Sequence, residues 1–278
     1  MNRASTAARS LPARETEESR AEGSAGGLAL DRAGRVLLAA DLHLAGGPEP
    51  RERLRRLLAL SRAEDASLYL LGDVFHYWLG RRHLARPEVR REVEILRGAS
   101  AVGPPIAIVP GNRDYLLDDS FTRATGVRIA PAAIAVACAG LRLHLSHGDL
   151  FGLADVRYLR MRRALRSAPV RFLARSLPTP VIAAIAGGLR RHSERVVPRK
   201  SAETLAPDRA AVAAILAGGF DAVVCGHFHD RREERLPAAE GGGLFRVLEP
   251  FEVRGYALSL GPEGWREHFV AAAKSVPS

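Results

Sequence analysis

Five short clusters of polar residues in this sequence combine side chains that could hold metal ions and support hydrolysis. They contain aspartate carboxylates, one asparagine amide and histidine imidazoles, and no cysteine. Oxygen and imidazole ligands in these numbers suit two divalent metal ions better than one. They favour Mn²⁺, with Fe²⁺ or Zn²⁺ as alternatives, over a structural cysteine site. The clusters are Asp41–His43, Gly72–Asp73, Gly111–Asp114, Ser146–Asp149 and Gly226–His229.

Each cluster directly follows a short apolar run of the length of a buried strand. Because ligands in α/β sheets bind beyond the carboxyl ends of strands, five such ends would bring seven ligands to one rim. Taken singly, a histidine after a strand could belong to a hydrogen-bonded turn, and a glycine before Asp73 or Asn112 could serve a tight turn. All five clusters together favour a shared site. The runs are Val36–Ala40, Leu68–Leu71, Ile106–Val109, Leu141–Leu145 and Ala222–Cys225.

Helical segments separate these runs, since apolar residues recur at helical spacing within 54–58, 89–96 and 212–216. The alternation predicts an α/β fold. The last part of the chain predicts a closing meander of three strands. Cys138 and Cys225 lie in apolar runs, which predicts buried, reduced thiols. The meander strands would be Leu244–Leu248, Gly255–Leu260 and a final strand around His268–Val270.

The composition is that of an ordinary globular protein, because 47% of the 278 residues are apolar and 26% are charged. Residues 1–30 lack the apolar centre of a signal peptide, so we expect a disordered tail before one domain at 31–278. The apolar stretch Leu177–Leu189 has only 13 residues, whereas a membrane span needs roughly 17 to 25. These features predict a cytoplasmic protein.

Basic residues are concentrated in one segment. The formal net charge is +10, and all but Lys200 and Lys274 of the 41 basic residues are arginine, which suggests a GC-rich genome. Residues 157–200, however, carry eleven arginines and one lysine against the single acid Glu194, a net charge of +11. Codon bias does not remove acids from one stretch, so an anionic partner is expected there.

The ordered blocks D-x-H, G-D, G-N-[HR]-[DE], H-G and G-H-x-H resemble those of the calcineurin-like metallophosphoesterases. Within that superfamily the segments DLHL, LGDVFHYWLG, GNRDYLL and HGD resemble the UDP-2,3-diacylglucosamine hydrolase family. The resemblance runs from about Val36 to Leu260. It implies a four-layer α/β/β/α sandwich with a helical lid inserted at about 155–204.

The resemblance also implies roles for individual residues. Asp73 would bridge two metal ions and, with Asn112 and Arg113, would be catalytic. Two such cations activate water for in-line attack on phosphorus. One metal would be held by Asp41, His43 and His229, and the other by Asn112, His147 and His227. Substrate would contact Asn112, Arg113, Asp155, Ser193, Lys200 and His227, although Asp155 could instead be a helix cap and Ser193 and Lys200 a solvated face.

Arg113 stands where most of the superfamily has histidine. An arginine is no general acid at neutral pH, but it can clamp phosphate with two parallel hydrogen bonds. A phosphate leaving group needs little protonation, which favours a pyrophosphate substrate. The resemblance implies cleavage of the pyrophosphate of UDP-2,3-diacylglucosamine to UMP and 2,3-diacylglucosamine 1-phosphate, in lipid A biosynthesis. The chain departs from the family pattern at Val197 and at Glu249–Phe251, so its contacts with the headgroup of the substrate could differ from those of the family.

The lid interleaves apolar and basic residues. It could be a helical hairpin packed on its own domain, but we favour a surface that receives acyl chains and lies on an anionic bilayer. The expected partners are an acylated UDP-sugar and the cytoplasmic face of the inner membrane. Neither nucleic acid nor an obligate protein partner is expected.

Two other functions fit the same residues. One is a metallophosphoesterase of this fold acting on another nucleotide diphosphate or phosphodiester. The other is a basic protein that binds nucleic acid on an inactive scaffold, without metal. Among the remaining histidines, His76 could touch the site, and His144 is interpreted as structural because it lies on the opposite strand face. His83, His192 and His268 are expected to be exposed.

Overall fold

The computed structural model describes residues 34–151, 181, 188, 206–238 and 242–270. The predicted tail at 1–30 and almost all of the predicted lid at 155–204 lie outside these residues. Within the described part, no helix has both the length and the apolar character needed to cross a bilayer.

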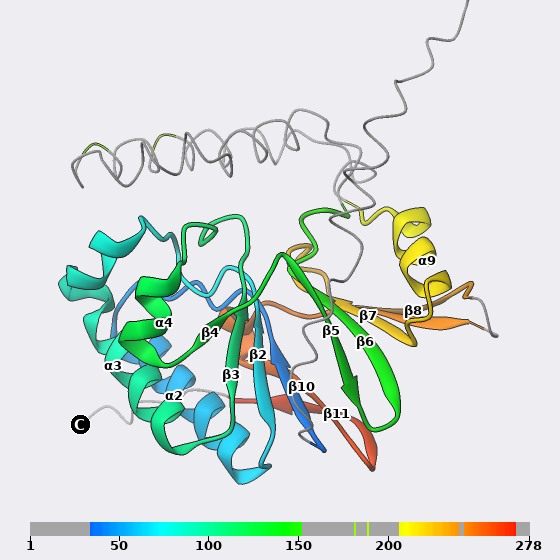
Figure 1. The fold of residues 1–278 in the computed structure, drawn as a ribbon, viewed down its shortest axis with the longest axis horizontal. Coiled ribbons are helices and arrows are strands. Elements are labelled where there is room, and N and C mark those ends of the chain that lie inside the picture. The colour runs from blue at the N-terminus through cyan, green and yellow to red at the C-terminus, as the bar shows by residue number, and fades with distance from the viewer. Residues whose placement is uncertain (1–33, 152–180, 182–187, 189–205, 239–241, 271–278) are drawn as a thin grey trace, which may run out of the picture.

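Two β-sheets pack face to face between two layers of helices (Figure 1). The first sheet has the strand order β11-β10-β1-β2-β3-β4, and the second has the order β5-β6-β7-β9-β8. The first comprises β1 (Val36–Ala39), β2 (Ser67–Leu71), β3 (Ile106–Val109), β4 (Arg128–Ile129), β10 (Tyr256–Gly261) and β11 (Gly264–Phe269). The second comprises β5 (Ala133–Cys138), β6 (Leu141–Ser146), β7 (Ala222–Cys225), β8 (Arg232–Leu236) and β9 (Gly243–Val247).

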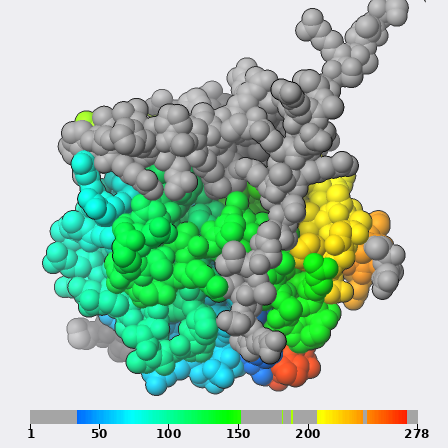
Figure 2. Space-filling view, viewed as in Figure 1, coloured from blue at the N-terminus to red at the C-terminus, as the bar shows by residue number. Residues whose placement is uncertain are grey.

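Alternation along each strand divides the apolar side chains between layers. In β1, Leu37 packs toward the helices and Leu38 toward the second sheet. The helices α2 (Pro48–Ala63), α3 (Pro87–Val102) and α4 (Asp119–Thr125) cover the first sheet, and α9 (Arg209–Ala217) covers the second. A space-filling view shows α9 in yellow on the opposite flank from α2 to α4 (Figure 2). The four-layer α/β/β/α sandwich is therefore confirmed.

The parallel strands that end in polar clusters match the predicted apolar runs to within one residue at each end. β1, β2 and β3 are parallel neighbours in the first sheet, and β6 and β7 are parallel neighbours in the second. Helices α2 and α3 connect β1, β2 and β3, and each begins with proline in its first turn, where no backbone donor is needed. The clusters therefore emerge along one edge of each sheet.

The predicted closing meander is wrong. β9 pairs in parallel with β7 in the second sheet, whereas β10 and β11 form an antiparallel hairpin in the first sheet. Between them the chain changes sheet through the short helix α10 (Phe251–Arg254). Alternating hydrophobicity identified the strands correctly, but pairing is decided by contacts distant in sequence.

His83 also differs from its prediction, because it is only 3% exposed. It lies in a short 3₁₀ helix at Arg81–Ala85, and its ring packs 4.8 Å from that of Trp78. His268 is half-buried and contacts Ser259. His192 lies outside the described residues. Cys138 and Cys225 are buried free thiols, as predicted.

His144 is buried on the strand face that packs toward α9, with its ring 5.5 Å from that of Phe220, in keeping with its predicted structural role. Burial lowers its pKa to about 4 from the ordinary 6.5. Between these two pH values the unfolded chain binds a proton that the folded chain does not, so the free energy of unfolding falls as the pH drops through this window.

We expect His144→Leu to weaken this pH dependence. The loss of unfolding free energy between pH 7 and pH 5 should be smaller in the variant than in the parent protein by roughly 2 kcal/mol. Urea unfolding of both proteins at the two pH values, with chelator present, measures it. The same loss in both proteins would contradict the burial of a neutral imidazole at this position.

Candidate metal centre

The seven predicted ligands come together at the rim where the two sheets meet. The loop after β1 carries Asp41 and His43, and the loops after β2 and β3 carry Asp73 and Asn112. The second sheet contributes His147 after β6 and both His227 and His229 after β7. The first two loops run side by side beyond their strands, because His43 N donates to Asp73 O at 3.0 Å and Leu44 N donates to Val74 O at 2.9 Å.

Five of these residues have a left-handed backbone conformation. The φ angles are 54° at Asp41, 46° at His43, 49° at Asp73, 71° at His227 and 56° at His229. This conformation is uncommon outside glycine, although Asp and His are among the residues that adopt it more readily. In these five residues it occurs in the turns that follow β1, β2 and β7. Such strain is typical of functional sites, where the surrounding structure enforces it.

Glycines beside the ligands leave the space that these side chains occupy. A Cβ atom added to Gly72 would lie 2.3 Å from His147 Nδ1, and one added to Gly111 would lie 2.2 Å from Asp73 Oδ1. A Cβ atom on Gly226 would lie 2.4 Å from Asp41 Oδ2. These distances are far below van der Waals contact. Gly72 and Gly226 therefore let loops of the two sheets approach at the rim, and Gly111 lets the loops after β2 and β3 approach each other.

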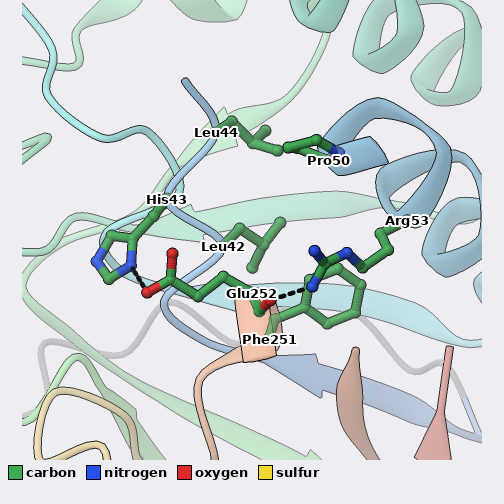
Figure 3. Close-up of a pocket in the computed structure, with 7 residues that line it drawn as sticks. All are labelled: Leu42, His43, Leu44, Pro50, Arg53, Phe251 and Glu252. Atoms are coloured by element: carbon green, nitrogen blue, oxygen red, sulfur yellow. Dashed lines mark hydrogen bonds and ion pairs between the residues drawn. The ribbon is translucent and has the colours of Figure 1, made fainter. Parts of the chain in front are cut away.

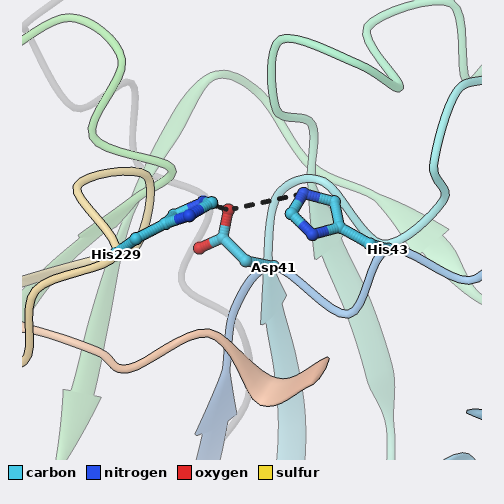
Figure 4. Close-up of side chains that lie close together, drawn as sticks. All are labelled: Asp41, His43 and His229. Atoms are coloured by element: carbon cyan, nitrogen blue, oxygen red, sulfur yellow. Dashed lines mark ion pairs between the residues drawn. The ribbon is translucent and has the colours of Figure 1, made fainter. Parts of the chain in front are cut away.

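One group of side chains surrounds Asp41 (Figure 4). Its Oδ1 atom lies 3.4 Å from His229 Nε2 and 4.0 Å from His43 Nε2. Its Oδ2 atom accepts a hydrogen bond of 2.9 Å from the backbone N–H of His227. Asp41 and His43 are buried, whereas the His229 side chain is 44% exposed. The group is therefore open toward solvent on the side of His229.

A second group surrounds His147. Its Nδ1 donates to the backbone oxygen of Leu71 at 3.0 Å, so Nε2 faces the rim. Nε2 lies 3.0 Å from Asn112 Oδ1 and 3.2 Å from His227 Nδ1. Asp73 lies between the two groups, because Oδ1 is 3.7 Å from His147 Nε2 and Oδ2 is 3.6 Å from His43 Nε2.

The electrostatics of the rim favour positive charge. Burial alone would raise the pKa of Asp73, but the neighbouring imidazoles of His147 and His43 and the backbone N–H of Arg113 outweigh it and hold this pKa far below its usual range. Burial opposes a charged His147, yet the carboxylates of Asp73 and Asp41 raise its pKa to about 9. Burial and the charge of His147 lower the pKa of His227 to about 4.

These residues fit a divalent cation. Asp41 Oδ1 and His43 Nε2 are buried and have no hydrogen-bond partner among the described residues. Two sets of ligand atoms lie close enough to share an ion, namely Asp41 with His43 and His229, and Asp41 with Asp73 and His147. Buried acceptors without donors cost free energy unless something satisfies them, and a cation bound by oxygen and imidazole would do so.

Arg113 lies beside this rim. Its backbone N–H donates to Asp73 Oδ1 at 2.9 Å, and its Nε lies 3.2 Å from Asp73 Oδ2. The side chain is 34% exposed, so the guanidinium reaches from a buried carboxylate to solvent. Sequence reasoning assigned no role to Asp114, the last residue of the Gly111–Asp114 cluster. Its buried carboxylate accepts from Gly111 N and Val74 N, both at 2.7 Å, and so ties the loops after β2 and β3 together.

Other predicted contacts have different outcomes. Asp155, Ser193 and Lys200 lie outside the described residues, so their predicted substrate contacts stay predictions. The ring of His76 lies 6.2 Å from that of His43, at the edge of the site. Sequence reasoning missed Glu252, whose Oε1 lies 2.7 Å from His43 Nδ1. Nothing in the sequence pattern distinguished this glutamate from surface acids.

The chain belongs to the calcineurin-like phosphoesterase family, whose model matches residues 34–231. It is a metal-dependent hydrolase of that family, and the resemblance seen in the sequence is confirmed.

Several similar proteins carry the name UDP-2,3-diacylglucosamine hydrolase. One from Pseudomonas fluorescens is 31% identical over 236 residues, which cover 83% of this chain and 93% of that protein. One from Ralstonia nicotianae is 32% identical over 219 residues, covering 74% and 81%. One from Edwardsiella ictaluri is 32% identical, covering 82% and 89%.

Proposed function

We propose that this protein hydrolyses the pyrophosphate bond of UDP-2,3-diacylglucosamine, giving UMP and 2,3-diacylglucosamine 1-phosphate. The observation that carries the hydrolytic part is the gathering of seven oxygen and nitrogen ligands from five strand ends at one rim. The substrate is taken from the names of relatives that match most of this chain. Overall, water adds across the bond, so that one phosphorus gains its oxygen and the bridging P–O bond breaks.

We assign Asp41, His43 and His229 to one divalent ion, and Asn112, His147 and His227 to a second. Asp73 would contact both, in keeping with its position within 3.7 Å of imidazoles in each group. The ions, which we propose to be Mn²⁺ from the mixed oxygen and imidazole set, lower the pKa of water and offset charge on the phosphoryl oxygens.

Arg113 and Asn112 would orient the substrate. With Nε on Asp73, the terminal nitrogens of Arg113 have no hydrogen-bond partner among the described residues and would donate to phosphoryl oxygens as negative charge grows on the leaving phosphate. The ionic contact with Asp73 holds the guanidinium in place before substrate binds. Because arginine supplies no proton, the site suits a leaving group that departs as a phosphate.

The lid residues Asp155, Ser193 and Lys200 would contact the substrate, and the basic segment 157–200 would lie on the anionic cytoplasmic face of the inner membrane. In this proposal the lid receives the acyl chains. Co-sedimentation with vesicles containing anionic lipid, and none with neutral vesicles, is the expected result. If equal amounts of protein sediment with anionic and with neutral vesicles, membrane binding does not depend on electrostatic attraction to the lipid.

A direct test compares acylated and deacylated UDP-glucosamine as substrates of metal-stripped protein supplied with Mn²⁺. We expect release of UMP from the acylated substrate, loss of activity without the acyl chains, and no turnover with excess chelator. Equal turnover of both substrates would instead favour a phosphoesterase for another nucleotide diphosphate or phosphodiester. That alternative is raised by Glu249–Phe251, where the chain departs from the family pattern.

A further inference from the structure

Helix α10 packs directly against the loop that carries Asp41 and His43. The backbone N–H of Phe251 donates to Ala40 O at 2.9 Å, and that of Glu252 donates to Asp41 O at 3.4 Å. The Phe251 side chain is buried in the core under this loop. Arg53 of α2 donates to the backbone oxygen of Glu252 (Figure 3). Glu252 is therefore fixed through its backbone, independently of its carboxylate.

The carboxylate of Glu252 points at the side of His43 that faces away from Asp41 and Asp73. His43 Nδ1 lies 2.7 Å from Glu252 Oε1, at the edge of a small pocket between α10 and the loop after β1 (Figure 3). An ionised carboxylate only accepts hydrogen bonds, so Nδ1 must carry the proton. In the neutral ring, which is the form that can bind a cation, Nε2 is then left with its lone pair, 3.6 Å from Asp73 Oδ2 and 4.0 Å from Asp41 Oδ1.

When His147 is neutral, a different partner selects the same tautomer. There the backbone oxygen of Leu71 accepts from Nδ1 at 3.0 Å, and Nε2 faces the rim. A neutral carbonyl fixes only the orientation and the tautomer. A carboxylate also makes the imidazole a stronger electron donor at Nε2. His43 thus has the more strongly polarising partner, and it comes from a segment 209 residues further along the chain.

We propose that Glu252 is a positioning residue of the metal centre. It holds His43 in the Nδ1–H tautomer, aims Nε2 at the space beside Asp41 and Asp73, and thereby raises the affinity of the centre for a divalent cation. The inference rests on the metal centre of the proposed function but not on the identity of its substrate.

The test measures metal affinity rather than turnover. Calorimetric titration of metal-stripped protein with Mn²⁺ should give a Kd raised about 10-fold to 100-fold by Glu252→Ala, the range typical when a partner of a metal ligand is removed. Glu252→Gln should have a smaller effect, because its amide oxygen still accepts from Nδ1. The Glu252 side chain is 46% exposed, so its removal leaves no buried cavity.

Glu49→Ala is the matched control. Glu49 is a surface carboxylate that pairs with Arg53 at 2.8 Å, so its loss removes the same charge at the junction of α2 and α10 without touching His43. Its Mn²⁺ affinity should match that of the parent protein. An unchanged affinity in Glu252→Ala, or an equal loss in both alanine variants, would overturn the proposal.

A second measurement reports on the tautomer without metal. At a pH high enough to keep the ring neutral, the ¹⁵N shifts of His43 should show Nδ1 protonated and Nε2 unprotonated in the parent protein, with this preference reduced in Glu252→Ala. An Nε2–H tautomer in the parent protein would also overturn the proposal. If the parent protein binds Mn²⁺ normally but does not cleave the acylated UDP-sugar, the substrate assignment fails while the role of Glu252 stands.

Discussion

Asp73→Asn is expected to lower kcat by more than about 100-fold, which exceeds the usual cost of losing a residue that only supports a metal ligand. The substitution removes the charge that lies between His43 and His147. Its amide oxygen can still accept from Arg113 N. Asparagine also tolerates the left-handed backbone at this position, where φ is 49°. The metal-free variant should therefore keep its fold.

Steady-state kinetics with Mn²⁺, together with melting curves in chelator, measure both parts of this expectation. Asp65→Asn provides the control, because Asp65 has a similar φ of 47° but lies exposed after α2, away from the rim. It should retain full turnover. Activity of Asp73→Asn near the parent level would refute the role of Asp73 between the two groups of ligands.

Gly72→Ala is expected to destabilise the protein by about 2 to 5 kcal/mol, the sum of left-handed backbone strain and overpacking. It should also abolish tight Mn²⁺ binding. The added Cβ would lie 2.3 Å from His147 Nδ1 and 2.8 Å from Gly111 Cα. His147 would have to leave the oxygen of Leu71, which sets its orientation. Urea unfolding in chelator and metal titration measure the two effects.

Gly140→Ala separates backbone strain from steric overlap. Gly140 has a φ of 79°, the same as that of Gly72, but a Cβ there would meet no atom within 4 Å. We expect a loss of only about 1 to 2 kcal/mol from the left-handed backbone and no change in Mn²⁺ affinity. Equal behaviour of the two variants would show that contact with His147 is unimportant.

Apolar runs in the sequence were sufficient to predict the parallel strands and the rim that carries the polar clusters, whereas the four layers were implied by the family resemblance. Buried strands are recognisable as apolar runs, and because the carboxyl ends of parallel strands share an edge, polar clusters after β1, β2, β3, β6 and β7 had to emerge at the rim. The prediction did not require knowing that these strands divide between two sheets. It therefore survived the wrong assignment of β9 to a closing meander.

Other features of the site depend on contacts distant in sequence. Glu252 contacts His43 only because α10 packs on the loop after β1, and no local pattern encodes that approach. The left-handed turns at Asp41 and His43 also have no sequence signature as clear as a glycine. His83 was predicted to be exposed, yet aromatic rings cover it in the fold.

The rim has a further consequence, because its two sides belong to different sheets. His43 comes from the first sheet and His229 from the second, so an ion bound by both would cross-link the seam of the sandwich. Binding restricted to the folded state stabilises it in proportion to the logarithm of the free ion concentration. The concentration of the ion would thereby affect how readily the protein unfolds. The metal-bound protein would keep its two sheets together under conditions in which the metal-free protein opens.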